Sequence, residues 1–339
     1  MRSRTSTIQS PTVTSFPAST MFVTAALFVG TGCADIAELR EHLPYTGFPD
    51  SLSARCSDGM KFVPCESVGD SAPQDGHTLI GRPAYHLSGN DVVDELTGLS
   101  WYSTPGPRGG QSEAKKYCES LDGNYRLPSR IELVTLLDFR ANSPVRIDRD
   151  YFPNVKPIQY WTDTVYTMEH SSIWMVDFCG SCGNEFAVVH TYLSNPDVGV
   201  LCVKDSGEPY KPGPFEVSGP ENQFLRDART GLEWLTVRKQ TNVAWKESLA
   251  ACHEARDGSY TDLRMPNAKE LQTLVDETAM DMNPSVIQGT DIKYNNIIWS
   301  STPSQVEGEI FVLNATGGSI GRQPSGNTHL YTLCVRGPD

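Results

Sequence analysis

The chain carries one stretch of its sequence twice, and this duplication constrains the fold more than any other feature. Residues 94–138 and 227–276 share, in the same order, an aspartate, Thr-Gly-Leu-x-Trp, a cysteine, Arg-x-Pro, Glu-Leu and a final aspartate. The matching positions are Asp94 and Asp227, Trp101 and Trp234, Cys118 and Cys252, Arg126 and Arg264, Glu132 and Glu270, and Asp138 and Asp276. A repeat of this length indicates a duplicated domain and not a solenoid unit.

Each copy predicts the same series of short elements. The Thr-Gly turn predicts a β-hairpin with Gly98 at a position of positive φ, and residues 112–121 have the apolar spacing of a helix. Directly after each Arg-x-Pro step, a Ser or Asn stands three residues before a Glu, which predicts capped second helices at 130–138 and 268–277. Short strands are predicted at 160–162, 173–176 and 200–204 in the first copy and at 298–300, 310–313 and 332–336 in the second.

These elements predict the fold class and the domain organisation. Each domain should be α+β, with two helices and a mostly antiparallel sheet, and 339 residues suffice for two such domains. The predicted segments are a signal peptide at 1–32, a tether and pre-domain loop segment at 33–83, a first domain at 84–205, a linker at 206–214 and a second domain at 215–339.

The N-terminal segment predicts export. Arg2 and Arg4 are the only charges before the apolar run at 21–29, which suits a signal peptide and is too short to span a bilayer. Small residues directly before Cys33 resemble a bacterial lipoprotein signal, so we expect lipid on Cys33, with plain secretion as the alternative. A lipoprotein of this kind would lie at the bacterial outer membrane or cell surface, and otherwise in the periplasm or outside the cell.

The net charge limits the partners. It is −13 for the whole chain, and removal of the leader takes away two positive charges and no negative one. Nucleic acid, heparin-like polymers and anionic membrane surfaces are therefore poor partners by bulk charge, so that contact with a membrane is expected only through the lipid. The sequence indicates no oligomeric state.

The nine cysteines predict a disulfide framework. Without Cys33 eight remain, which suggests four disulfides in an oxidising compartment. Each copy has one cysteine in its first helix and one in its final strand, and this correspondence argues for two long-range pairs. The remaining cysteines lie close enough in sequence for two local pairs. The expected disulfides are Cys118–Cys202, Cys252–Cys334, Cys56–Cys65 and Cys179–Cys182.

The repeated motifs together resemble the Lcl C-terminal domain family, named for the Legionella collagen-like adhesin and long catalogued as a bacterial domain of unknown function. The resemblance covers roughly 43–205 and 215–339. It implies two tandem C-type-lectin-like domains, related to formylglycine-generating domains, in which a disulfide from first helix to last strand is also used. The chain lacks Glu-Pro-Asn and Trp-Asn-Asp motifs, so calcium-dependent sugar binding is not carried over. The family adhesin binds sulfated polysaccharides, which fits an acidic chain poorly.

The repeated polar and aromatic residues favour structural roles. Trp101 and Trp234 could stack on sugars, but their place in a hydrophobic motif favours core packing. Arg126 and Arg264 could bind anions, but pairing with a nearby acid or carbonyl at the proline turn is favoured. Asp94 and Asp227 are most simply turn-formers that bond the following backbone.

The Cys179-x-x-Cys182 motif has three interpretations. A structural disulfide is favoured. A zinc site would need both thiolates with His170 and His190, which export disfavours, and a redox pair lacks the helix start that lowers a thiol pKa. The formylglycine-generating relatives use a cysteine pair catalytically, but their relation to this chain rests on the fold alone.

We therefore predict a non-enzymatic binding or adhesion module without cofactor or metal, which contacts an extracellular or cell-surface glycan or protein. Contact is expected through the loops 139–172, 178–198, 278–296 and 314–330. The insertion from about Trp174 to His190 should set specificity, with Trp174, Asp177, Glu185 and His190 as ligand-binding residues. The alternatives are a structural envelope component without soluble ligand and a thiol or metal enzyme that uses Cys179 and Cys182.

Overall fold

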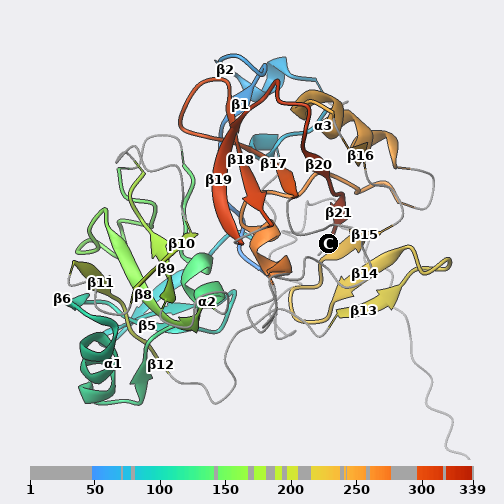
Figure 1. The fold of residues 1–339 in the computed structure, drawn as a ribbon. Coiled ribbons are helices and arrows are strands. Elements are labelled where there is room, and N and C mark those ends of the chain that lie inside the picture. The colour runs from blue at the N-terminus through green and yellow to red at the C-terminus, as the bar shows by residue number, and fades with distance from the viewer. Residues whose placement is uncertain are drawn as a thin grey trace, which may run out of the picture. The chain divides into compact units, whose positions relative to one another are not determined.

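Each repeat builds two small sheets from short strands (Figure 1). The structure is a computed structural model and describes residues 48–69, 72–77, 81–140, 144–166, 172–180, 188–192, 197–204, 215–236, 240–241, 243–256, 260–275, 296–315 and 318–337. The expected signal peptide and Cys33 lie outside these residues. Residues 45–339 belong to one compact unit.

The first repeat contains two five-stranded sheets and two helices. One sheet has the order β3(Tyr85–Ser88), β4(Asp91–Asp94), β5(Ser100–Tyr102), β12(Val203–Lys204) and β7(Tyr125–Arg126). The other has the order β10(Val188–Tyr192), β9(Ser172–Asp177), β8(Gln159–Val165), β11(Val198–Val200) and β6(Gly106–Gly109). The helices are α1(Gln111–Ser120) and α2(Arg130–Thr135).

The second repeat follows the same plan. Its first sheet has the order β13(Phe215–Ser218), β14(Phe224–Asp227), β15(Glu233–Leu235) and β21(Val335–Arg336). Its second sheet has the order β16(Gln240–Thr241), β20(Tyr331–Thr332), β17(Ile297–Pro303), β18(Glu309–Asn314) and β19(Ser319–Pro324). The helices are α3(Trp245–Glu254) and the 3₁₀ helix η4(Glu270–Leu274).

The prediction of two α+β, lectin-like domains is wrong. The described chain is mostly β, with short helices and four small sheets, two in each repeat. The expected closing strand at 200–204 is two strands: β11 pairs with β6 and β8, and β12 pairs with β5 and β7. The chain changes sheet at Leu201-Cys202, and again at Leu333-Cys334, where a disulfide joins the backbone to the first helix of the repeat.

The second helices are also shorter than expected. In place of 130–138, α2 ends at Thr135, and in place of 268–277, η4 is a 3₁₀ turn. The caps themselves are confirmed: the hydroxyl of Ser129 accepts the N–H of Glu132, whose carboxylate accepts the N–H of Ser129 at 2.8 Å. After α2 the backbone bonds to distant partners, since the N–H of Asp138 donates to the carbonyl of Arg146 at 3.0 Å and that of Phe139 donates to the carbonyl of Ser51 at 2.9 Å.

The core of each repeat contains the repeated tryptophans. Trp101 and Trp234 are buried, which confirms the packing interpretation. Two other buried tryptophans donate their indole N–H to a backbone carbonyl. Trp161 donates to Gly109 and Trp245 donates to Ser300, each at 2.8 Å. The Trp161 bond links β8 to β6 within one sheet, and the Trp245 bond joins α3 to β17.

The pre-domain segment packs against the second repeat, although the first repeat follows it in sequence. It contains the hairpin β1(Cys56–Ser57) and β2(Phe62–Val63) and the turns η2(Cys65–Ser67) and η3(Asp75–His77). In Figure 1 this hairpin lies beside β18 and β19. The Arg55 guanidinium donates to the carbonyl of Ser304 at 3.1 Å, and the Thr302 hydroxyl donates to the Asp75 carboxylate at 2.5 Å. Residues 48–77 are therefore part of the folded unit.

The two repeats share buried polar contacts. The Arg130 guanidinium donates to the side chain and the carbonyl of Gln272. In the opposite direction, the Lys269 ammonium donates to the carbonyls of Asp50, Thr135 and Leu137 at 2.8 to 3.0 Å. Burial lowers the pKa of Lys269 to about 8. We call this contact region the seam, which Phe139 and Phe311 complete with ring centroids 4.9 Å apart.

Candidate functional site

The repeated arginines act inside the fold. The Arg126 guanidinium holds both carboxylate oxygens of Glu132, each at 2.8 Å, and Arg264 holds those of Glu270 at 2.6 and 2.7 Å. A bidentate pair of this kind fixes both planes. The pairing interpretation of the sequence is therefore confirmed, and neither arginine is a surface anion site.

The aspartates before Thr-Gly form turns, as expected. The Asp94 carboxylate accepts the N–H of Leu96 at 3.0 Å and the Thr97 hydroxyl at 2.8 Å. Asp227 accepts the N–H of Arg229 at 2.9 Å. Gly98 follows with a φ of 73°, a left-handed conformation that favours glycine.

The disulfides staple each repeat. The structure contains Cys118–Cys202, Cys252–Cys334 and Cys56–Cys65, which confirms three of the expected pairs. Cys179 is also in a disulfide, and Cys182 and His170 lie outside the described residues. A sulfur held in a disulfide offers no thiolate to a metal, which argues against the zinc interpretation. The redox interpretation, in which a disulfide is one of the two working states, stays a prediction.

The predicted specificity insertion is interior where the structure describes it. Trp174 and Asp177, both in β9, are 3% and 1% exposed. The Trp174 ring packs edge-on against Tyr166, and the guanidinium of Arg130 lies 5.5 Å from its centroid. The Asp177 carboxylate accepts the N–H of Cys179 at 2.8 Å. Neither side chain therefore faces a ligand in solvent.

Of the other two predicted ligand residues, the structure describes only the backbone of one. Glu185 lies outside the described residues. His190 lies in β10 opposite Trp174 in the antiparallel register, but its side chain is outside the described part of the structure.

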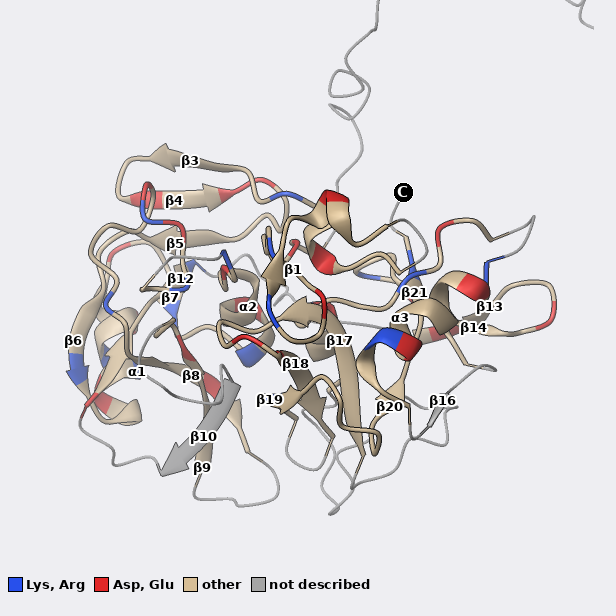
Figure 2. Ribbon diagram, turned by 90° about the horizontal axis from the view of Figure 1, so that it is seen from above, with Lys and Arg blue, Asp and Glu red and all other residues tan. Residues whose placement is uncertain are grey.

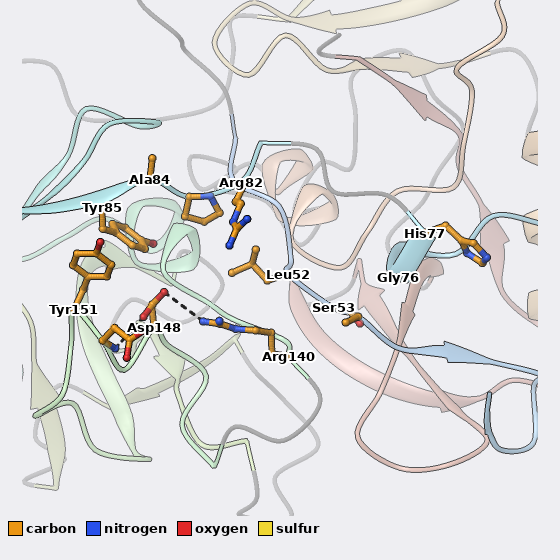
Figure 3. Close-up of a pocket in the computed structure, with 13 residues that line it drawn as sticks. Leu52, Ser53, Gly76, His77, Arg82, Ala84, Tyr85, Arg140, Asp148 and Tyr151 are labelled. Atoms are coloured by element: carbon orange, nitrogen blue, oxygen red, sulfur yellow. Dashed lines mark hydrogen bonds and ion pairs between the residues drawn. The ribbon is translucent and has the colours of Figure 1, made fainter. Parts of the chain in front are cut away.

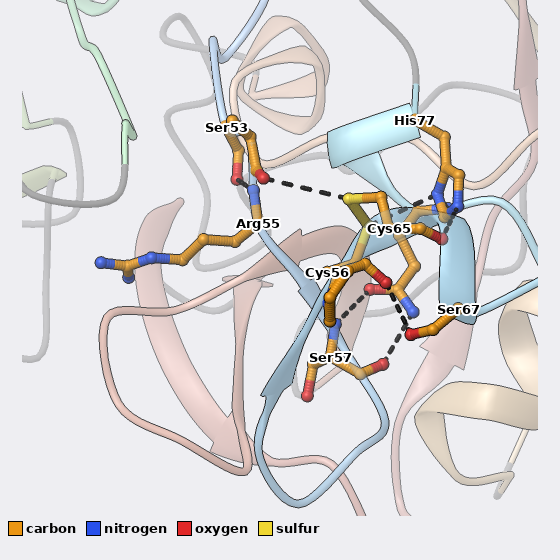
Figure 4. The surroundings of a disulfide bond; sticks show 10 residues. Ser53, Arg55, Cys56, Ser57, Cys65, Ser67 and His77 are labelled. Atoms are coloured by element: carbon orange, nitrogen blue, oxygen red, sulfur yellow. Dashed lines mark hydrogen bonds between the residues drawn. A yellow bond between two sulfur atoms is a disulfide. The ribbon is translucent and has the colours of Figure 1, made fainter.

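One group of potential metal ligands occurs among the described residues, and it is already occupied by protein contacts (Figure 4). His77 lies beside the Cys56–Cys65 disulfide, with Nδ1 3.5 Å from the Cys56 sulfur. The N–H of Gln74 points at Nδ1, which assigns the proton to Nε2, and Nε2 donates to the carbonyl of Cys65 at 2.9 Å. With both ring nitrogens used, this cluster braces the pre-domain segment.

Gly76 makes this close packing possible. A Cβ at this position would lie 2.6 Å from the carbonyl oxygen of Arg55 and 2.8 Å from the sulfur of Cys65. Only glycine lets the Gln-Asp-Gly turn approach the disulfide so closely. The turn buries the Asp75 carboxylate between Ser51 and Thr302 and places His77 at the edge of a cleft.

This cleft has a volume of about 660 Å³ (Figure 3). The pre-domain segment forms one side, and the start of β3 and the loop after α2 form the other. The charged and aromatic residues that line it are His77, Arg82, Tyr85, Arg140, Asp148, Asp150 and Tyr151. It therefore joins two segments that residues 86–139 separate in the sequence.

An aromatic cluster anchors one wall of the cleft. Phe152 is fully buried and packs edge-on against Tyr85, whose ring centroid lies 5.4 Å from that of Tyr151. A turn positions Tyr151, because the Asp148 carboxylate accepts the N–H of Asp150 at 3.0 Å and its carbonyl accepts that of Phe152. Burial raises the pKa of Tyr85 well above its ordinary value, so the phenol keeps its proton.

Charged groups of both signs line the remainder. Arg140 pairs with the buried Asp138 and lies 3.4 Å from Asp148, and the hydrogen bond to Asp138 raises the pKa of Arg140. Arg82 and Asp150 are exposed. On the opposite side Leu52 has a φ of 62°, a strained conformation that the bond from its N–H to the Asp50 carboxylate holds at 2.7 Å.

Sequence reasoning found only part of this cleft. The predicted contact loop 139–172 contains Arg140, Asp148 and Tyr151. Arg82 and Tyr85 were missed, because they stand where the sequence predicts the end of a tether and the start of a domain. The succession of charged residues directly before Tyr151 was the available signal.

The fold and the cleft define a class: a duplicated, disulfide-stapled, mostly β domain with an open polar cleft beside its first copy. The chain belongs to the Lcl C-terminal domain family, whose model matches residues 90–203 and 223–336. The two matches are the two repeats, and membership suggests an adhesin-like extracellular module. No curated protein matches the chain. Among the described residues, no helix has the length and apolar character that a membrane crossing requires.

Proposed function

We propose that this protein is an exported, non-enzymatic adhesin-type module that binds an extracellular or cell-surface glycan or protein in the cleft. Family membership supports the adhesin-type assignment. We choose the cleft as the site because two tyrosine rings and charged groups of both signs line one open cavity of about 660 Å³.

The chemistry of the cleft suits a ligand rich in hydroxyl groups. The face of Tyr151 offers an apolar plane for a sugar ring or a peptide side chain. Arg82 donates several hydrogen bonds and Asp150 accepts them, so adjacent hydroxyls find complementary partners. Figure 2 shows acidic and basic positions scattered over both repeats, and the net charge of −13 disfavours binding of a polyanion.

The binding proposal is tested with glycan and surface-protein arrays. The complete chain should bind at least one class of ligand, and Tyr151→Ala combined with Arg82→Ala should weaken that binding more than tenfold. Arg108→Ala is the control, because Arg108 is an exposed residue outside the cleft that pairs with Asp197. Equal loss with the control, or binding that the double variant leaves intact, would contradict the cleft as the site.

The location is a separate part of the proposal. We infer that lipid on Cys33 anchors the chain at the outer membrane or cell surface, because a short apolar run and small residues precede this cysteine. Mass spectrometry of the mature protein should show a lipidated N-terminal cysteine. A Cys33→Ala variant should then appear in the soluble fraction, and unchanged membrane association would contradict the anchor.

Exposed aliphatic residues favour a second candidate, a structural envelope component that assembles with copies of itself. Leu87 on β3 and Val217 on β13 are 64% and 65% exposed, at equivalent positions of two edge strands. Edge strands with exposed apolar residues can pair between chains. Sedimentation at rising concentration should show oligomers that Leu87→Lys and Val217→Lys abolish. A monomer at all concentrations would exclude this candidate.

A further inference from the structure

The strand β3, whose first residue lines the cleft, has an open edge. It lies at the end of its sheet and pairs with β4 on one side, and Figure 2 shows this hairpin at the outside of the first repeat. Leu87 in its middle is 64% exposed. The strand contains no proline or lysine and its register has no bulge, which are the devices that protect sheet edges. This edge is therefore accessible to a further strand.

The register of the hairpin determines which backbone groups of β3 face outwards. A two-residue turn, Gly89-Asn90, joins β3 to β4. Hydrogen-bonded and non-hydrogen-bonded pairs alternate along such a hairpin, and the N–H of Glu95 donates to the carbonyl of Ala84 at 2.9 Å. Tyr85 and Leu87 therefore occupy non-hydrogen-bonded positions, and their N–H and C=O groups point away from β4.

These outward groups are unpaired within the part of the chain that the structure describes. Two donors and two acceptors thus lie along one line, two residues apart. This is the spacing at which a neighbouring extended backbone presents its own N–H and C=O groups. A glycan offers hydroxyl groups but no backbone repeat of this kind, so the edge favours a polypeptide.

The side chains on this edge add an apolar position. Tyr85 and Leu87 lie on the same face of the sheet, because side chains two residues apart do so. The residue paired with Leu87 across the ladder is Val92, which is fully buried. An added strand would extend this row beyond Leu87, and an apolar side chain at that position would cover the exposed leucine.

The edge of β3 is continuous with the cleft. Ala84 and Tyr85 line the cleft at the start of the strand (Figure 3). A segment that pairs with Leu87 and Tyr85 therefore reaches the cleft, where the exposed Arg82 and Asp150 offer charges of both signs. The backbone of a ligand and its polar side chains thus find partners along one path.

We propose that the ligand of the cleft is an extended polypeptide segment, which adds to the edge of β3 as a further strand. Its backbone pairs with Tyr85 and Leu87, an apolar residue covers Leu87, and its polar end lies in the cleft. The inference rests on the proposed binding function of the cleft and narrows the ligand to a segment of an extracellular or cell-surface protein.

The second repeat supplies a matched control. Val217 is 65% exposed on the edge strand β13 and pairs with Leu225, the counterpart of Val92. Among the described residues that line the cleft, none belongs to β13. Strand addition that uses the cleft therefore depends on Leu87 and not on Val217.

The test uses the complete chain and, as the probe, a displayed library of random linear peptides of about ten residues. Leu87→Pro removes the outward N–H at a position where a strand edge tolerates proline, and it should weaken binding of a selected peptide about tenfold. Val217→Pro should leave binding unchanged. Leu87→Thr keeps the N–H and should weaken binding only about two- to threefold.

A second measurement needs no altered protein and therefore stands even if Leu87→Pro fails to fold. Methylation of single backbone nitrogens in the selected peptide should weaken binding at every second residue, because only alternate N–H groups of an added strand face β3. Amide hydrogen exchange at Tyr85 and Leu87 should slow when the peptide binds.

The outcomes separate this inference from the proposed function. An alternating methylation pattern with slowed exchange at Tyr85 and Leu87 establishes strand addition. Peptide binding that Tyr151→Ala with Arg82→Ala weakens, without these two signs, keeps the cleft as the site and overturns strand addition, as does binding of glycans alone. Equal loss with Val217→Pro also overturns it. Slowed exchange that rises with protein concentration in the absence of peptide assigns the edge to a second copy of the chain instead.

Discussion

In both repeats the arginine of the Arg-x-Pro step holds, through two hydrogen bonds, the glutamate six residues later. The side chains of Arg126 and Glu132 are 22% and 0% exposed, however, whereas those of Arg264 and Glu270 are 7% and 6% exposed. The difference lies in what surrounds the pair, since the local motif is the same. A duplicated motif can therefore retain its internal chemistry while its surroundings diverge.

The two positions directly before this glutamate show the divergence more clearly. Arg130 and Ile131 in the first repeat stand where Ala268 and Lys269 stand in the second. Ile131 is an ordinary core residue, whereas Lys269 crosses the seam to three carbonyls. At these positions the two copies are therefore not symmetric. Arg130 of the first repeat donates hydrogen bonds to the second repeat, and Lys269 of the second repeat donates hydrogen bonds to the first.

The largest expected effect should be equal in the two repeats. Replacing Cys118 and Cys202 by alanine, or Cys252 and Cys334, opens loops of 84 and 82 residues. Each change should cost about 4–5 kcal/mol in the chain-entropy model. Denaturant unfolding under non-reducing conditions measures both. Costs that differ by more than about 2 kcal/mol would show that the repeats are not equivalent even at their staples.

The two Arg–Glu ion pairs should contribute different amounts to the free energy of unfolding. Glu270→Gln keeps the cap acceptor for the N–H of Asn267 but leaves the buried Arg264 without a counter-charge, so we expect a loss of about 3–5 kcal/mol. Glu132→Gln should cost about 1–3 kcal/mol, because Arg126 reaches solvent. Urea unfolding of both variants gives the two values. Equal losses would contradict the role assigned to burial.

The seam lysine should matter more than its counterpart. Lys269→Met removes the donor to three buried carbonyls and should cost about 3 kcal/mol of the free energy of unfolding. Ile131→Val deletes one methyl group and should cost about 1 kcal/mol. Both variants are compared by denaturant unfolding. A Lys269→Met protein as stable as the unaltered chain would refute the bridging role.

The pre-domain segment adds a pH dependence of its own. Burial is the main cause that raises the pKa of Asp75 to about 8 from 3.8. An unfolded Asp75 ionises near pH 4 while the folded one retains its proton, so stability from this group falls as pH rises from about 4 to about 8.

Asp75→Asn keeps an acceptor for the hydroxyls of Ser51 and Thr302 and should remove this fall. The advantage of the variant over the unaltered protein should grow by about 3 kcal/mol between pH 5 and pH 7. Thr164→Val is the control, since Thr164 is the counterpart of Thr302 and accepts the N–H of Arg130. Parallel stability profiles of the Asp75→Asn and unaltered proteins would contradict a neutral Asp75.

Much of the local structure could be predicted because its chemistry lies within a few residues. The Thr-Gly turns and the caps follow from spacing, whereas the long-range cysteine pairs follow from their recurrence in both copies. For the arginine of the Arg-x-Pro step the sequence left open whether an acid or a carbonyl is the partner. The sheets could not be predicted in the same way. A strand of two or three residues shows no periodicity, and the change of sheet at Cys202 leaves no mark in the sequence.

By itself, the sequence determined the duplication, the disulfide pairs of each copy and the residues that form the turns and caps. Only the tertiary structure decided that each copy has two sheets, that Trp174 and Asp177 are interior, and that the pre-domain segment packs against the second repeat. The reason is physical: hydrogen bonds between near neighbours are specified by spacing, whereas burial depends on which distant surfaces meet. The cleft therefore arises from segments that are distant in the sequence.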